Sequence, residues 1–289
     1  MKEFADPNRA AYWCYKWRER GARIGFVPTM GALHDGHLAL VRRARAENDY
    51  AVVSIFVNPL QFGDARDYDL YPRDFEADAV LLSMEGAALA FTGTLAQFFP
   101  DSGGNLAKVA LRDPGSAAEG LEGELRPGHF EGVATIVARL FELVRPTRAY
   151  FGEKDFQQTR VVLELAKELG GPPITVCPTL RDADGLALSS RNARLSVEQR
   201  REALALSRAL YAARAAWQRG ERDPAALCAV LARVAGDSAL RLEYAEVRDP
   251  EVWTAERPRG PLARAQALLA AFCGDVRLID TLRLDAPSE

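Results

Sequence analysis

Two of the three histidines in this chain lie three residues apart, in the segment PTMGALHDGH (residues 28–37). The segment follows an apolar run that predicts a strand and leads into a helical pattern, so its backbone N–H groups should lie at a helix N-terminus, where anions bind. Gly31 and Gly36 would let a ligand approach the main chain closely. If the helix begins near His34, then His34 and His37 share one face and can both donate to phosphate oxygens. This arrangement favours phosphoryl or nucleotidyl transfer over the alternative, in which the rings only cap the turn.

Other common phosphate, dinucleotide or metal sites are not indicated. The spacing HxxH supplies only two metal ligands, and no cysteine or third histidine lies near it in the sequence. Neither GxxxxGKS/T nor GxGxxG occurs, so kinase and dehydrogenase interpretations lose their main support. The pattern HxGH is similar to the signature of the nucleotidyltransferase superfamily that includes the class I aminoacyl-tRNA synthetases. That resemblance implies attack at the α-phosphate of a nucleotide.

A lysine follows a later predicted strand, in FGEKDFQQ (residues 151–158). In a parallel sheet, loops that join a strand to the next helix lie at one edge, where ligands bind. We therefore expect this segment and the histidine pair to reach one pocket. Lys154 would place a point charge on the phosphates, and Gln158 could hydrogen-bond a polar substrate.

Hydroxyl groups and a guanidinium gather in DGLALSSRN (residues 184–192). Ser189, Ser190 and Arg191 could bind a triphosphate. The alternative is a helix-capping loop, since serine and asparagine commonly cap helices. Because the segment lies where the chain changes character, we favour a mobile phosphate-binding loop.

Two further segments carry polar side chains. In FVNPLQFG, Asn58 and Gln61 offer donors and acceptors without charge, which suits a substrate rich in hydroxyls and bearing a carboxylate. The alternative there is a simple turn. In RPGHF, His129 stands near Arg126 and either contacts an anion or orders the start of the following helix. We favour the second interpretation for His129.

Strand and helix patterns alternate over the first part of the chain. Strands are predicted at 23–28, 50–57, 88–92, 148–151 and 174–177, with helices at 36–49, 74–85, 130–144 and 157–169 between them. This alternation predicts an α/β fold with a Rossmann-like, doubly wound parallel sheet.

The pattern changes after about residue 183. Two helices at 197–219 and 224–235 precede strand-like runs at 240–247, 265–272 and 276–284, with no helix between these runs. We predict a smaller α+β C-terminal domain with an antiparallel sheet, and we place the domains at 1–182 and 183–289.

Composition is that of an ordinary globular protein. The 289 residues carry a formal charge of -3, which excludes a surface that attracts nucleic acid or anionic membrane as a whole. The four cysteines are scattered without a CxxC pair, so we expect free, mostly buried thiols. Because we find no signal-peptide pattern and no long apolar run, we expect a cytoplasmic location.

Taken together, the motifs resemble the pantothenate synthetase (pantoate–β-alanine ligase) family, which joins pantoate to β-alanine. The matching segments occur in order between residues 28 and 280: PTMGALHDGHLALV, VSIFVNPLQFG, LYPRDFEAD, RPGHFEGV, FGEKDFQQ, DGLALSSRN and VRLID. The resemblance implies a Rossmann-like domain that holds ATP and pantoate, a smaller domain that closes over them, and a homodimer.

The resemblance also assigns residues to ligands. It implies ATP contacts by Met30, Gly31, Ala32, Leu33, His34, Asp35, Gly36, His37, Gly152, Glu153, Lys154, Asp155, Leu180, Leu188, Ser189, Ser190 and Arg191. His37 would be the proton donor, and Gln61 and Gln158 would bind pantoate, with Gln61 also near β-alanine. Asp78 is a candidate support for a magnesium ion that the phosphates would mainly hold.

The chemistry expected from this resemblance has two steps. The carboxylate of pantoate attacks the α-phosphorus of Mg-ATP to give pantoyl adenylate and pyrophosphate, and the amine of β-alanine then displaces AMP. His34, His37, Lys154 and Arg191 would stabilise the developing charge. Two alternatives stay open: a nucleotidyltransferase that adenylylates another small substrate, and a nucleotide-binding regulatory protein without turnover. A tRNA ligase is not favoured, because no basic anticodon-binding extension follows.

Overall fold

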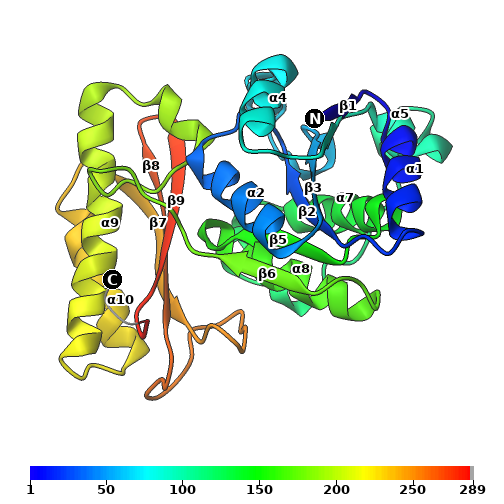
Figure 1. Ribbon diagram of the computed structural model, residues 1–289. Coiled ribbons are helices and arrows are strands. Elements are labelled where there is room, and N and C mark those ends of the chain that lie inside the picture. The colour runs from blue at the N-terminus through cyan, green and yellow to red at the C-terminus, as the bar shows by residue number, and fades with distance from the viewer. Residues whose placement is uncertain (287–289) are drawn as a thin grey trace. The chain divides into compact units, whose positions relative to one another are not determined.

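The computed structural model describes residues 1–286, which divide into two compact units (Figure 1). The first unit contains residues 1–118, 122–152 and 157–177, and the second contains residues 119–121, 153–156 and the described residues from Pro178 to 286. Within the described residues, no helix combines the length and apolar character needed to cross a membrane.

The first unit is built on a six-stranded sheet in which every pair of neighbouring strands is parallel. Its order is β1-β4-β3-β2-β5-β6. The strands are β1 (Lys2–Phe4), β2 (Ile24–Thr29), β3 (Tyr50–Ile55), β4 (Leu89–Phe91), β5 (Arg148–Gly152) and β6 (Ile174–Cys177). From β2, the chain adds β3 and β4 on one side and then β5 and β6 on the other side, so the strand order reverses at β2. Ligands of such sheets bind beside this switch point.

Helices cover both faces of this sheet. The helices along residues 7–168 are α1 (Pro7–Arg18), α2 (Asp35–Glu47), α3 (Ala65–Asp69), α4 (Phe75–Met84), α5 (Leu95–Phe98), α6 (Leu121–Leu125), α7 (His129–Val144) and α8 (Phe156–Glu168), and the long ones among them cover the sheet. Helices α2 and α4 share a buried cluster with alternate residues of the strands, such as Val27 and Val53. Helix α7 lies on the other face of the sheet, where it packs against β2 and against α1 (Figure 1). The predicted doubly wound α/β fold is therefore confirmed.

Most of these elements follow from the sequence pattern. The apolar stripe predicted for 130–144 is buried along α7, and each fully buried Val, Leu or Phe there contributes about 1.5–3 kcal/mol. No element is predicted from the pattern of the first 22 residues, yet β1 and α1 lie there. A start signal for α1 is present in the sequence. Asp6 is the N-cap, with its side chain accepting a hydrogen bond from the Asn8 N–H, and Pro7 occupies the first turn.

The second unit has a three-stranded antiparallel sheet in the order β7-β8-β9. Its elements are α9 (Val197–Gln218), α10 (Pro224–Gly236), β7 (Arg241–Arg248), β8 (Gln266–Cys273) and β9 (Val276–Arg283). The two helices pack on one face of the sheet in a shared apolar core that includes Leu206, Leu231 and Leu269. The predicted α+β character of this part is confirmed.

The second unit also takes two short segments from the middle of the chain. The indole N–H of Trp253 donates to the carbonyl of Glu119 at 3.1 Å, and the ring of Phe156 lies 6.4 Å from that of Trp253. A Cβ at Gly120 would lie 2.8 Å from the carbonyl oxygen of Ala255, so the loop after β7 packs closely on this segment. The unit's main segment begins at Pro178, before the boundary that the sequence suggested after Asp182.

Short 3-10 helices complete both units. They are η1 (Pro59–Gln61), η2 (Pro100–Ser102), η3 (Leu106–Lys108), η4 (Ser116–Ala118), η5 (Glu153–Asp155) and η6 (Ser190–Arg194). Among these, η1, η5 and η6 contain residues that the sequence analysis assigned to ligands.

Candidate active site

The ends of three neighbouring strands of the first unit bring the predicted segments to one edge of its sheet. Because β2 is parallel to both β3 and β5, the loop after Thr29, the turn after Ile55 and the end of β5 at Gly152 lie at the same edge. The shared edge of the strand ends agrees with a parallel sheet. A common pocket for the histidine pair and Lys154 stays a prediction.

The loop between β2 and α2 has an unusual backbone. Gly31 has φ +84° and Ala32 has φ +51°, a left-handed conformation that is uncommon for alanine. A Cβ at Gly31 would lie 2.8 Å from Oδ2 of Asp78, so this position needs glycine for space as well as for φ. The backbone N–H groups of Ala32 and Leu33 donate to the Asp78 carboxylate at 3.0 and 2.8 Å. Asp78 therefore holds the loop in this shape.

Asp78 is almost fully buried in the first turn of α4. Burial raises the pKa of Asp78, and the N–H groups of Leu33 and Ala32 act in the opposite direction. Each carboxylate oxygen already accepts a hydrogen bond from the loop. In the part of the chain that the structure describes, no group of three or more His, Cys, Asp or Glu side chains could hold a metal ion. These contacts give Asp78 a clear structural role.

Helix α2 begins at Asp35, close to the start near His34 from which the sharing of one face was argued, and His34 is its N-cap. Nδ1 of His34 accepts from the N–H of Gly36 at 3.1 Å, and Nδ1 of His37 accepts from the N–H of His34 at 3.4 Å. A nitrogen that accepts carries no proton, so each neutral ring holds its proton on Nε2. The two ring centroids lie only 4.1 Å apart. The capping contacts of the alternative are therefore present, and they leave Nε2–H of each ring able to donate, so the donor role toward phosphate stays a prediction.

The turn after β3 fixes Gln61 through Asn58. Asn58 is almost fully buried, and its Nδ2 donates to Oε1 of Gln61 at 3.0 Å and to the carbonyl of Gly132 at 3.1 Å. Its Oδ1 accepts from the N–H of Leu60 at 3.3 Å, which caps η1. Asn58 is therefore a positioning residue. It holds Oε1 of Gln61 and does not occupy the NH2 group of that side chain.

His129 lies at the start of α7 and is buried. Its Nδ1 lies 2.9 Å from the backbone carbonyl oxygen of Gln61, and its Nε2 lies 3.1 Å from a guanidinium nitrogen of Arg126. These contacts agree with the interpretation that His129 orders the start of the helix. No signal in the sequence indicated that the histidine would also contact the turn that carries Gln61.

The two adjacent glutamines at the start of α8 have different environments. Gln157 is almost fully buried, with Oε1 accepting from the N–H of Glu122 at 2.9 Å and Nε2 donating to the carbonyl of Ala117 at 3.1 Å. Gln158 is partly exposed. The structure therefore gives Gln157 a packing role, and the assignment of the partly exposed Gln158 to a substrate stays a prediction.

Lys154 lies in η5, which is part of the second unit. Its side chain is 17% exposed, and Nζ lies 3.7 Å from Oδ2 of Asp155. Burial raises the pKa of neighbouring Glu153, while Arg283 and Arg181 act to lower it. The segment 153–155 therefore mixes an ammonium group with two carboxylates, one of them in a partly desolvated position.

Residues 180–188 form a tight hairpin in the second unit. The N–H of Leu188 donates to the carbonyl of Leu180 at 2.9 Å, which brings together two residues that the family resemblance assigned to ATP. The hairpin turns at Gly185, which has φ +95°. Just after it, Ser189 caps η6 by accepting from the N–H of Arg191 at 3.3 Å. The capping alternative thus describes Ser189, while Ser190 and Arg191 form the first turn of η6.

A buried ion pair, which the sequence motifs did not predict, lies beside this hairpin. The guanidinium of Arg181 donates to both carboxylate oxygens of Asp280 at 2.7 and 2.9 Å, and the Asp280 side chain is only 1% exposed. Burial raises the pKa of Asp280, and Arg181 opposes that shift. The sequence held a signal for this pair, because Asp280 shares the inward face of β9 with Val276 and Leu278. A carboxylate on that buried face needs a partner.

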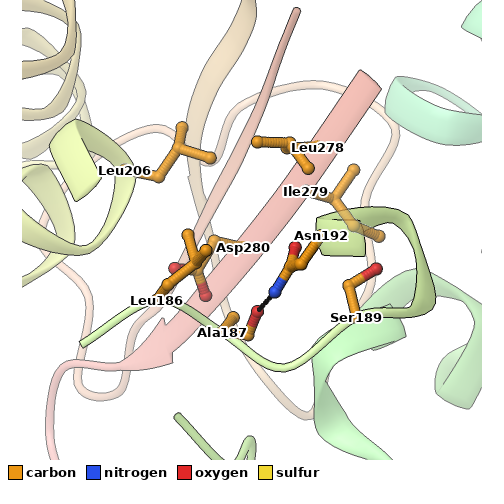
Figure 2. A pocket seen from close by; sticks show the side chains of 8 residues that line it. All are labelled: Leu186, Ala187, Ser189, Asn192, Leu206, Leu278, Ile279 and Asp280. Carbon is orange, nitrogen blue, oxygen red and sulfur yellow. Dashed lines mark hydrogen bonds between the residues drawn. The ribbon is translucent and has the colours of Figure 1, made fainter. Parts of the chain in front are cut away.

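A small cavity lies against the same carboxylate. Figure 2 shows Asp280, Ser189 and Asn192 around it, with Asn192 donating to the carbonyl of Ala187. Leucine and isoleucine side chains complete the lining. The cavity measures about 10 Å³, which is close to the room that one water molecule needs. A cavity of this size has room for about one water molecule beside the Asp280 carboxylate.

Comparison with known proteins gives one consistent family. The family model described as "Pantoate-beta-alanine ligase" matches residues 2–283. The pantothenate synthetase of Rubrobacter xylanophilus is 46% identical over 283 residues, covering 96% of this chain and 97% of that protein. The pantothenate synthetase of Acidobacterium capsulatum is 48% identical over 264 residues, covering 90% of this chain and 86% of that protein.

Solved structures agree with the sequence comparisons. A crystal structure of pantothenate synthetase from Thermus thermophilus superposes with a TM-score of 0.88 at 42% identity, covering 98% of this chain and 99% of that chain. A pantoate-beta-alanine ligase from Francisella tularensis, complexed with beta-gamma ATP and beta-alanine, superposes with a TM-score of 0.76 at 31% identity and covers 99% of both chains.

Proposed function

This chain belongs to the pantoate–β-alanine ligase family, and from that premise we propose how its residues carry out the reaction. The enzyme is a ligase that joins pantoate to β-alanine to form pantothenate. In the proposed reaction, the pantoate carboxylate attacks the α-phosphorus of ATP, which gives pantoyl adenylate and releases pyrophosphate. The β-alanine amine then attacks the acyl carbon, AMP leaves, and the amide bond is formed.

The observation that carries the proposal is the paired Nε2–H groups at the N-terminus of α2. Because Nδ1 of each histidine accepts from the backbone, both rings can donate from Nε2 while they are neutral. Donors fixed in place before the reaction stabilise charge that grows on phosphate oxygens, and they need no reorganisation to do so. We assign His34 and His37 to this task, with His37 as the proton donor to the departing pyrophosphate.

We propose that the other predicted residues bind ligands as the family resemblance implies. Met30, Gly31, Ala32, Leu33, Asp35, Gly36, Gly152, Glu153, Lys154, Asp155, Leu180, Leu188, Ser189, Ser190 and Arg191 would contact ATP. Lys154 and Arg191 would add positive charge to the phosphates. Gln61 and Gln158 would hydrogen-bond pantoate, and Gln61 would also lie near β-alanine. The neutral amides suit this task because they recognise hydroxyl and carboxylate oxygens without attracting phosphate.

The magnesium ion is proposed to enter as part of the Mg-ATP substrate. The described side chains do not fit a metal site held by the protein alone, since no cluster of three ligating groups is found among them. Both oxygens of Asp78 accept from the loop, which favours the structural role of that side chain over ligation. A homodimer and a cytoplasmic location remain predictions from the resemblance and from the composition.

The proposal is tested by exchange of labelled pyrophosphate into ATP, measured with and without pantoate and in the absence of β-alanine. We expect exchange only when pantoate is present, because the adenylate forms before the amine is used. AMP should accumulate only when β-alanine is added as well. Exchange without pantoate would indicate another nucleotidyl acceptor. ATP binding without any exchange would indicate a nucleotide-binding protein that has no turnover.

A further inference from the structure

Gln61 is held by a weak element that needs external support. It is the last residue of η1, a single 3-10 turn of three residues, and such turns have poor hydrogen-bond geometry of their own. The bond from the Gln61 N–H to the carbonyl of Asn58, which closes this turn, is 3.4 Å long. The position of this substrate-binding amide must therefore depend on neighbours outside η1.

The first turn of α7 provides that support at two points. Its Gly132 carbonyl accepts from Asn58, and its His129 ring contacts the Gln61 carbonyl at 2.9 Å. The fit is close, because a Cβ at Gly132 would lie 2.3 Å from the Leu60 carbonyl oxygen and 2.6 Å from the Gln61 nitrogen. The backbone of η1 thus lies directly on the start of α7.

The contacts of His129 fix which ring nitrogen carries the proton. A carbonyl oxygen can only accept, so Nδ1 of His129 must donate to Gln61. A guanidinium can only donate, so Nε2 must accept from Arg126. Glu122, whose side chain is 8% exposed, lies 3.5 Å from the same Arg126 nitrogen and offsets its charge. His129 is therefore neutral and points a single N–H group at Gln61.

We propose that His129 is a positioning residue for pantoate binding, acting by holding the main chain of Gln61 through its Nδ1–H group. The histidine touches no reacting atom, and it acts through Gln61, whose side-chain Oε1 is fixed separately by Asn58. With the backbone carbonyl and Oε1 both held, the plane of the Gln61 amide is restricted, and so are the directions in which its NH2 group can donate. This inference rests on the proposed assignment of Gln61 to pantoate.

The test uses the two amide side chains that imitate different ring nitrogens. In His129→Asn, the amide nitrogen takes the place of Nδ1 and can donate to Gln61. In His129→Gln, the amide lies near Nε2 and can meet Arg126 but not the Gln61 carbonyl. We expect His129→Gln to raise the KM for pantoate by roughly tenfold, as for the loss of one buried hydrogen bond. We expect His129→Asn to stay much closer to wild type, with kcat and the KM for ATP nearly unchanged in both variants.

A control separates positioning from general destabilisation. Ala138→Gly weakens α7 at a buried position further along the helix than Gly132, and its melting temperature should fall while its KM for pantoate stays unchanged. Equal KM values for His129→Gln and His129→Asn, or a rise in KM that follows the melting temperature across all three variants, would overturn the inference. Failure of the proposed function would look different, because wild-type protein would then show no pantoate-dependent exchange.

Discussion

The carboxylate of Asp78 lies 2.8 Å from the backbone nitrogen of Leu33, and this hydrogen bond joins helix α4 to the loop that precedes the histidine pair. A second bond, from Ala32 at 3.0 Å, holds the left-handed part of the same loop. The loop's N–H groups, and hence the start of α2, are thus set by a side chain from a different element. The shape of the proposed phosphate site depends on this pairing.

Asp78→Asn should disturb this loop. One amide NH2 would face a backbone N–H, which leaves a buried donor unsatisfied at a cost of about 1–3 kcal/mol. We expect a lower free energy of unfolding in urea and a higher KM for ATP in pyrophosphate exchange. Asp74→Asn is a matched control, because Asp74 caps α4 and asparagine caps equally well. Recovery of Asp78→Asn activity at high Mg²⁺ would instead support a metal-binding role.

Variants of His37 should separate its capping nitrogen from its donating nitrogen. His37→Ala loses both, and we expect pyrophosphate exchange to slow by about 100- to 1000-fold, as for removal of one oxyanion donor. His37→Asn keeps an acceptor for the His34 N–H and should recover stability but not rate. His37→Gln places a donor near Nε2 and should be faster than both. Near-normal turnover in His37→Ala would remove this residue from the mechanism.

The adjacent glutamines of α8 provide a direct contrast. Gln157→Ala breaks buried bonds to Ala117 and Glu122, so it should lower the free energy of unfolding by about 1–3 kcal/mol. Gln158→Ala should leave stability nearly unchanged and raise the KM for pantoate. Urea unfolding and initial-rate kinetics on both variants check this. An effect of Gln158→Ala on ATP alone would contradict its assignment to pantoate.

The buried Arg181–Asp280 pair should be costly to break on one side only. Asp280→Asn leaves the guanidinium without its charged partner, and removing one partner of such a pair costs about 3–5 kcal/mol. The double variant Arg181→Met with Asp280→Leu should recover much of that loss, because neither buried charge remains. Thermal unfolding of the wild type and the two variants measures this. A double variant that is less stable than the single one would argue against the desolvation account.

The cysteines should resist alkylation in the native protein. All four are free and buried, as the sequence analysis expected. Burial raises the pKa of Cys14 to about 12, and burial with nearby Glu246 raises the pKa of Cys228 to about 11. Since the thiolate is the reactive form, both should react with iodoacetamide at pH 8 far more slowly than glutathione does. Mass spectrometry should detect full labelling only after urea is added; rapid native labelling of Cys14 would show that α1 opens readily.

Local patterns predicted the parts of the site that local chemistry governs. The apolar run before Met30 and the helical spacing after it were enough to place His34 at a helix N-terminus, and α2 begins at Asp35. The same reasoning found β5 and α8 around Lys154. It failed at α1, where aromatic and charged residues mask the amphipathic pattern and only Asp6 and Pro7 mark the start.

Pairings between distant residues could not be predicted in this way. Ala32 and Asp78 are 46 residues apart, Gln61 and His129 are 68 apart, and Arg181 and Asp280 are 99 apart. A side chain's type limits what it can donate or accept, but it does not say which partner the fold brings within about 3 Å. The buried contacts of Gln157 with Glu122 and Ala117 have the same origin, because they depend on packing between segments.

The sequence by itself determined the alternation of strands and helices, the family, and the types of groups available for phosphate and carboxylate recognition, because these depend on residue type and on spacing along the chain. Only the tertiary structure decided which ring nitrogens carry protons, which carboxylate shapes the phosphate loop and which amide is held in place. These features depend on hydrogen-bond partners from other elements, and folding alone brings those partners together.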